Sequence, residues 1–157
     1  MWPLFLLIIA ANGTPVLLQT LLGGRWSTPV DLGLRLRDGH RLLGDAKTWR
    51  GLAGAIAAGT LLAPLLGLSP MLGAAAAALA MAGDLLASFV KRRLGRTRSS
   101  RALLLDTVPE SLFPGLGLML PLQLTALEVL VLVILFTLLD NLASPVLYRL
   151  RLRRRPW

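Results

Sequence analysis

The chain opens with MWPLFLLIIAANGTPVLLQTLL (residues 1–22), a stretch that contains no charged side chain. A helix of about 20 apolar residues is long enough to cross the roughly 30 Å hydrocarbon core of a bilayer. The stretch lacks the basic start and the small-residue cleavage site of a secretory signal. We therefore interpret it as a retained membrane span, which makes the chain an integral membrane protein.

Four further apolar blocks follow. Of the 157 residues, 55% are hydrophobic, and the mean hydropathy is +0.67. A soluble domain of this length does not need so much apolar sequence. The sequence predicts an all-α fold, with residues 1–157 forming a single polytopic membrane domain, a bundle of five transmembrane helices. The expected spans are residues 1–22, 51–68, 71–90, 107–122 and 124–150, of which the fourth is interrupted by prolines and glycines.

The basic residues predict the orientation of these spans. All 17 lie in two loops, residues 23–50 and 91–106, or in a tail at residues 149–157. Five spans put these three segments on one side of the membrane, and basic segments favour the cytoplasmic side. We expect the N-terminus outside, the C-terminus in the cytoplasm, and a location in the cell (inner or cytoplasmic) membrane. Charge beside membrane helices favours anionic lipid headgroups and phosphate substrates over nucleic acid.

One carboxylate lies inside the expected third span, where an ionised Asp costs about 2.5–3.5 kcal/mol near the bilayer centre. This residue, Asp84, shares a helix face with Ser88 and Lys91, and Gly83 permits close approach of a neighbouring helix. A carboxylate, a hydroxyl and an ammonium group on one face are typical of a functional site. The alternative is an Asp that stabilises the end of the span through a nearby cation.

Two more carboxylates open the expected fourth span. Asp106 and Glu110 lie one turn apart on the same helix face, and Asp106 could face Asp84 across the short basic loop. An Asp at a helix start, followed by Pro109 in the first turn, is also ordinary capping chemistry. Both interpretations stay open from these residues alone.

The first loop ends in GDAKTWRG (residues 44–51), where Asp45, Lys47, Thr48 and Arg50 precede or begin a helix. Cations, a hydroxyl and glycines at a helix N-terminus can bind phosphate. The segment is not a Walker A loop, because the glycine before the lysine and a preceding buried strand are missing. The alternative is a basic anchor for lipid headgroups.

Other polar residues admit two interpretations. Asn12 and Pro15 in the first span, and Asn141 in the last, either serve helix packing and kinking or line a substrate groove. In the first loop, alternating leucines before Asp38 and Gly39 predict a short hairpin. His40, the only histidine, lies in this loop, and we do not expect it to take part in catalysis.

The absence of cysteine and the single histidine argue against acyl transfer through a Cys-His or Ser-His pair. The sequence instead combines carboxylates with cations, the groups used in metal-assisted phosphoryl or nucleotidyl transfer. Carboxylates hold Mg²⁺, and Lys and Arg neutralise phosphate oxygens.

The chain resembles the CDP-archaeol synthase family and, more distantly, CDP-diacylglycerol synthase. The matching pieces occur in the family's order: residues 11–16 (ANGTPV), 29–31 (PVD), 38–39 (DG), 44–51 (GDAKTWRG), 83–84 (GD) with Ser88, 91–93 (KRR), 105–106 (LD) and 156–157 (PW). Members often have a second acidic residue three positions after the loop aspartate, and this chain has Pro109 there with Glu110 beside it.

The resemblance implies an enzyme that condenses CTP with a lipid phosphate, either archaeol-phosphate-like or phosphatidic-acid-like, to give a CDP-lipid and pyrophosphate. Asp84 and Asp106 would hold Mg²⁺, with Glu110 as a further candidate ligand, and Lys91 would act beside them. The implied nucleotide- and phosphate-binding residues are Asp45, Lys47, Thr48, Arg50, Ser88 and Arg92. The implied lipid groove is lined by Asn12, Pro15, Asp31 and Asn141. A non-enzymatic transporter or an anionic-lipid-binding scaffold would explain the charge asymmetry equally well, but not the aligned polar face of the third span.

Overall fold

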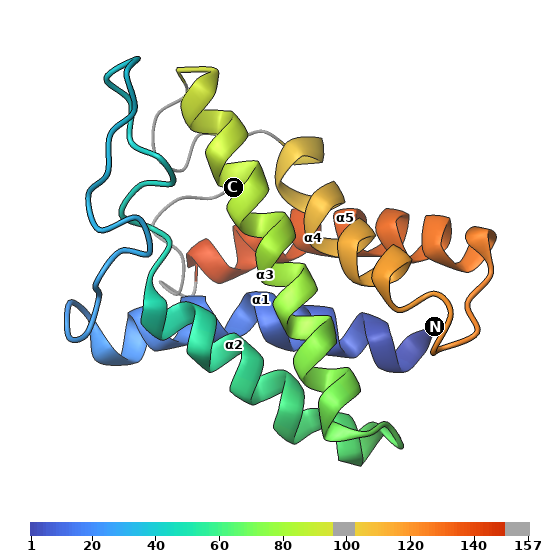
Figure 1. Ribbon diagram of the computed structural model, residues 1–157. Helices are drawn as coiled ribbons and strands as arrows, with labels where there is room; N and C mark the ends of the chain where they lie inside the picture. The colour runs from blue at the N-terminus through green and yellow to red at the C-terminus, as the bar shows by residue number, and fades with distance from the viewer. Residues whose placement is uncertain (96–102, 150–157) are drawn as a thin grey trace.

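The computed structural model describes residues 1–95 and 103–149, and these residues form five α-helices, which confirms the expected all-α fold (Figure 1). The basic tail, the closing Pro-Trp pair and the middle of the second basic loop lie outside the described residues. The helices are α1 (Trp2–Leu22), α2 (Trp49–Leu62, continued by the 3-10 turn η1, Ala63–Leu66), α3 (Pro70–Arg93), α4 (Leu103–Gly117) and α5 (Ala126–Arg149).

Local sequence signals set the helix boundaries. Thr48 caps α2 by accepting a hydrogen bond from the amide of Gly51 at 3.2 Å. Ser69 caps α3 in the same way, with Pro70 following at the first helical position. Side-chain oxygens at these positions satisfy amides that have no partner within the helix, and proline there loses nothing because its missing N–H would be unpaired.

Four of the described helices are long and apolar enough to cross a membrane: Trp2–Leu22, Trp49–Leu66, Pro70–Arg93 and Ala126–Ala143. The expected fourth span differs from the prediction. It begins earlier, at Leu103, and is only 15 residues long, which corresponds to about 22 Å of helix. Asp106 therefore lies within the first turn of α4 rather than at its cap.

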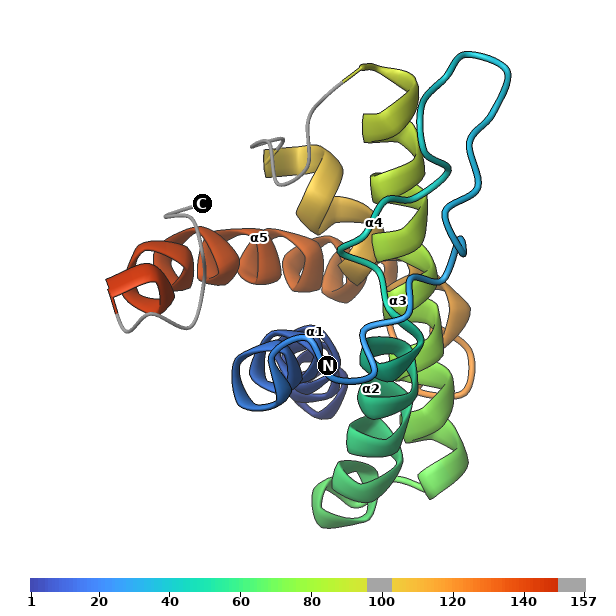
Figure 2. The ribbon, with the colours of Figure 1, turned by 90° about the vertical axis from the view of Figure 1, so that its left-hand side faces the viewer.

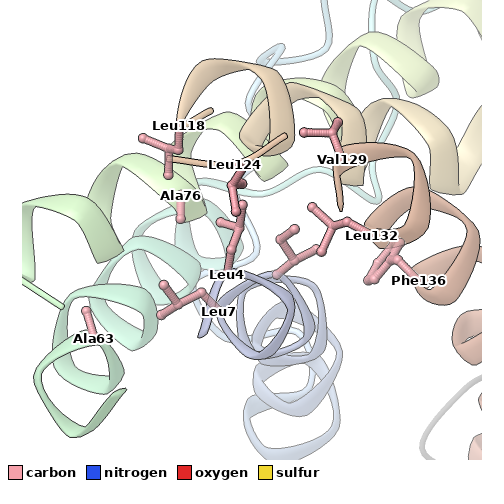
Figure 3. Packing of buried hydrophobic residues seen from close by; sticks show 10 residues of the cluster. Leu4, Leu7, Ala63, Ala76, Leu118, Leu124, Val129, Leu132 and Phe136 are labelled. Atoms are coloured by element: carbon pink, nitrogen blue, oxygen red, sulfur yellow. The ribbon is translucent and has the colours of Figure 1, made fainter. Parts of the chain in front are cut away.

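Helix α3 is the centre of the bundle. It contacts α1, α2 and α4, while α5 packs mainly on α4. Figure 2 views α1 nearly end-on, with α2 and α3 beside it. Figure 3 shows the main apolar core, in which Leu4 of α1 lies beside Leu124, Leu7 points toward Ala63, and Leu132 and Phe136 enter the same cluster from α5.

The α2–α3 contact depends on two glycines. A Cβ at Gly59 would lie 2.6 Å from the carbonyl oxygen of Gly73 and 2.8 Å from the Cβ of Ala77. Small residues let helix backbones approach closely, which is how helices associate where lipid gives no hydrophobic drive. This close packing fixes how α3 is oriented against α2.

The loop between α1 and α2 stands beside the C-terminal end of α3 (Figures 1 and 2). The expected hairpin is present as a single bridge between Arg35 and Arg41 that encloses the turn at Gly39. Arg93 of α3 holds this hairpin, because its guanidinium binds the carboxylate of Asp38 and the carbonyl oxygens of His40 and Arg41.

Candidate active site

The carboxylate of Asp84 on α3 is paired with a loop cation. The Lys47 ammonium lies 2.5 Å from both carboxylate oxygens, and both side chains are mostly buried, with exposed fractions of 23% for Lys47 and 19% for Asp84. Burial alone would lower the pKa of Lys47, but the charges of Asp84 and Glu110 outweigh it and raise that pKa above its ordinary value. Lys47 therefore stays charged within this group.

A second carboxyl group reaches Asp84 from α4. Gly83 lies against the α4 backbone so closely that a Cβ there would stand 2.7 Å from the amide nitrogen of Glu110. The expected close approach of a helix at Gly83 is thus confirmed. It brings Glu110 close enough to Asp84 for their two carboxyl groups to interact electrostatically.

Asp106 takes a different partner. Its carboxylate lies 2.5 Å from the ammonium of Lys91, which joins the start of α4 to the end of α3. Within residues 1–95 and 103–149, no three side chains of His, Cys, Asp or Glu gather closely enough to form a metal site on their own. The structure brings Asp84 and Glu110 together and holds Asp106 nearby in an ion pair.

A basic cavity of about 90 Å³ adjoins these pairs, between the first loop and the last turns of α3. Ser88, Lys91 and Arg92 line it from α3, and Gly44 and Lys47 line it from the loop, together with Leu43 and Ala46. Three cations and a buried hydroxyl suit oxyanions, because charge-assisted hydrogen bonds are the strongest that a protein makes to phosphate. Of the three residues expected on one face of α3, Ser88 and Lys91 line this cavity, while Asp84 adjoins it through Lys47.

Three of the other expected phosphate-binding residues do not line the cavity and have partners elsewhere in this structure. Arg50 donates from its guanidinium to the Gln19 side chain at 2.8 Å and to the carbonyl of Gly23 at 3.2 Å. It thereby covers the C-terminal end of α1, where unpaired carbonyls need donors. Thr48 is the cap of α2, and Asp45 is a largely exposed partner of Arg41.

The residues expected along a lipid groove come from α1, the first loop and α5, and each has its own surroundings. The Asn12 side-chain nitrogen is buried on α1, with no hydrogen-bond partner among the described residues. Pro15 lies close to Gly51 of α2, and Asn141 donates to the Thr137 carbonyl within α5 at 2.7 Å. Asp31 is buried inside the first loop, where it binds Arg41 at 2.6 Å.

Sequence reasoning included Gly44 and Ala46 in the expected phosphate-binding segment, residues 44–51, but it missed Leu43 and Arg41. These residues carry no chemical motif of their own. The one available signal was glycine at position 44, whose backbone has a φ of +92°, in the left-handed region that glycine favours.

Comparisons with known proteins all point to one protein family. A family model described as "CarS-like: CDP-archaeol synthase" matches residues 3–157. A CDP-archaeol synthase of Pyrobaculum calidifontis is 40% identical over 98% of this chain and 96% of its own, and one of Sulfurisphaera tokodaii is 35% identical over 98% and 92%. A solved structure titled "Structural insight into an intramembrane enzyme for archaeal membrane lipids biosynthesis" has a TM-score of 0.68 and 39% identity, covering 92% of this chain and 91% of its own.

Proposed function

Because this chain belongs to the CDP-archaeol synthase family, we propose that its basic cavity and the adjoining Asp84–Glu110 pair are where it condenses CTP with archaeol phosphate. The protein is a CTP-dependent cytidylyltransferase of membrane lipid biosynthesis, and its product is CDP-archaeol.

The single observation that carries the assignment of the site is the composition of the cavity. Lys47, Lys91 and Arg92 converge with the Ser88 hydroxyl on one small volume at the end of α3. A triphosphate is the densest negative charge among the substrates, and fixed cations in a partly buried site attract it strongly. The volume of about 90 Å³ accommodates phosphate groups, so the nucleoside lies outside it.

The carboxylates beside the cavity fit a divalent cation. Asp84 and Glu110 interact within a partly buried site, and like carboxylates this close need a proton or a cation between them. Mg²⁺ is usually held by one or two carboxylates together with substrate phosphates and waters. Asp84 and Glu110 would hold it, with Asp106 close by, and bound Mg²⁺ would neutralise charge on the nucleotide phosphates.

The transfer itself needs little from the protein beyond position and charge. An oxygen of the archaeol phosphate attacks the α-phosphorus of CTP. The new P–O bond forms as the bond from the α-phosphorus to the β-phosphate oxygen breaks, and pyrophosphate leaves. A phosphate monoester is already ionised at neutral pH, so no general base is required. Lys47, Lys91 and Arg92 stabilise the charge on the leaving pyrophosphate, and Ser88 orients the triphosphate.

The orientation in the membrane follows from charge. The basic first loop and the end of α3 carry the cavity, and basic segments favour the cytoplasmic side, where CTP is available. The N-terminus then lies outside. This topology requires the short helix α4, extended by the turns at residues 118–123, to complete the fourth crossing.

The isoprenoid chains of the lipid would lie between helices, open to the bilayer. The buried Asn12 amide offers a donor to the polar end of the lipid, because no described residue accepts its hydrogen bond. Pro15 and Asn141 are the further candidates for this surface.

The test is lipid product formation from radiolabelled CTP by the purified protein with Mg²⁺. Archaeol phosphate should yield labelled CDP-archaeol, and phosphatidic acid in a parallel reaction reports how strictly the ether lipid is required. No labelled lipid from either substrate would refute the proposed function.

A further inference from the structure

Asp31 is the most heavily bonded side chain of the first loop. Its side chain has an exposed fraction of 0%. One carboxylate oxygen accepts from the Arg41 guanidinium at 2.6 Å, and the other accepts from the amides of Leu43 at 3.0 Å and Gly44 at 2.9 Å. The amide of Gly33 adds a fourth contact at 3.2 Å. A buried carboxylate that accepts this many hydrogen bonds organises the loop around it.

Asp31 holds the part of the first loop that forms one side of the cavity, here called the loop wall. Leu43, Gly44, Ala46 and Lys47 line it, and Asp31 binds the first two of them through their backbone amides. The residue before Asp31 holds the other end, because the amide of Val30 donates to the carbonyl of Lys47 at 2.8 Å. Both ends of the wall therefore depend on residues 30 and 31.

The carboxylate of Asp31 is charged at any pH where the protein works. Burial would raise the pKa of Asp31, but the hydrogen bonds from Arg41 and from the amides of Gly44, Leu43 and Gly33 bring it well below its usual range. Neutralising this group weakens every one of these bonds, because hydrogen bonds to an ionised acceptor are roughly twice as strong as neutral ones.

We propose that Asp31 is a positioning residue for CTP binding, which acts by holding Lys47 and the Gly44 backbone against the triphosphate. This assignment rests on the proposed function of the cavity. It replaces a lipid-groove role for Asp31, since within residues 1–95 and 103–149 the hydrogen-bond partners of its carboxylate all lie in the first loop. Asp31 belongs to no helix and to neither apolar core cluster, so its loss should loosen the loop and leave the bundle assembled.

The experiment measures equilibrium binding of CTP with Mg²⁺ to the unaltered protein and four variants. Asp31→Asn keeps the shape and removes the charge. Asp38→Asn is the matched control, because Asp38 is a loop aspartate that also pairs with an arginine but lies at the hairpin, away from the cavity. Lys47→Met and the double variant Asp31→Asn/Lys47→Met test whether Asp31 acts through Lys47.

We expect CTP binding to weaken roughly tenfold in Asp31→Asn and to change less than about twofold in Asp38→Asn. In the Lys47→Met background, Asp31→Asn should weaken CTP binding much less than it does in the unaltered protein, because the effects of residues that act through one another are not additive. Undiminished binding in Asp31→Asn, or a full additional loss in the double variant, would overturn the proposal.

Two controls keep the result interpretable. If Asp31→Asn does not accumulate as folded protein, Arg41→Gln takes its place, because it removes the guanidinium and leaves the carboxylate; about threefold weaker binding, again largely absent with Lys47→Met, is then expected. Product formation by the unaltered protein is measured separately. Its absence counts against the proposed function, whereas CTP binding that is indifferent to Asp31 counts only against the positioning role.

Discussion

Replacing Gly83 with alanine tests the contact that joins α3 to α4. The added Cβ would stand 2.7 Å from the Glu110 amide nitrogen and closer still to the Pro109 carbonyl, both of them backbone atoms. Because ordinary contacts of this kind are about 3.5 Å, α4 must move away from α3 by roughly 1 Å. No flexible side chain can absorb the change.

The displacement should act on stability and on catalysis together. Overpacking of a close contact costs about 1–3 kcal/mol, which should appear as a lower Tm in detergent. The same movement separates Glu110 from Asp84, and misplacing a reacting group by about 1 Å can cost about 100-fold in rate. We expect Gly83→Ala to lose at least tenfold in kcat for CDP-lipid formation.

The matched control is Gly13→Ala on α1, where an added Cβ meets nothing within 4 Å. Alanine exceeds glycine in helix propensity by up to about 1 kcal/mol, so the Tm of this variant should be unchanged or higher. A Gly83→Ala protein with the Tm and kcat of the unaltered enzyme would refute the packing argument and the role given to Glu110.

Three further predictions follow from the ion pairs. Lys47→Met leaves Asp84 and Glu110 without their cation, so the Tm in metal-free buffer should fall and added Mg²⁺ should restore it more than in the unaltered protein; an equal response would contradict the metal assignment. Arg50→Gln should lower the Tm yet raise the KM for CTP less than Lys47→Met does, because the guanidinium of Arg50 is bound to the end of α1. The lowered pKa of Asp31 means that its stabilising effect is present above the unfolded pKa of about 3.9 and is lost as the pH falls toward the lower folded value. The Tm difference between the unaltered protein and Asp31→Asn should thus be constant from about pH 8 to 5 and shrink below about pH 4.

Much of the fold could be predicted because the bilayer imposes it on the sequence. The apolar blocks predicted most helix positions within a few residues. The weak block at 107–122 was the exception, since α4 starts earlier, at Leu103, but already ends at Gly117 and is shorter than a full span. Hydropathy alone does not tell a short buried helix from a crossing one.

The helix face of Asp84, Ser88 and Lys91 could be predicted from spacing, because 3.6 residues per turn is fixed geometry. The partners of these residues could not. Asp84 meets Lys47, a residue 37 positions away, and Arg50 turns toward α1 although it lies only three residues beyond Lys47. Such choices depend on how the loop folds over α3, and a local sequence pattern contains no information on that packing.

The measurement that tests the central claim most directly is CDP-archaeol formation by Asp84→Asn beside Asp38→Asn, from radiolabelled CTP, archaeol phosphate and Mg²⁺. Both proteins should be folded, with the bundle intact. We predict that Asp84→Asn forms no product above background, while Asp38→Asn turns over at close to the rate of the unaltered enzyme. Near-normal turnover by Asp84→Asn would contradict the placement of the active site beside this carboxylate.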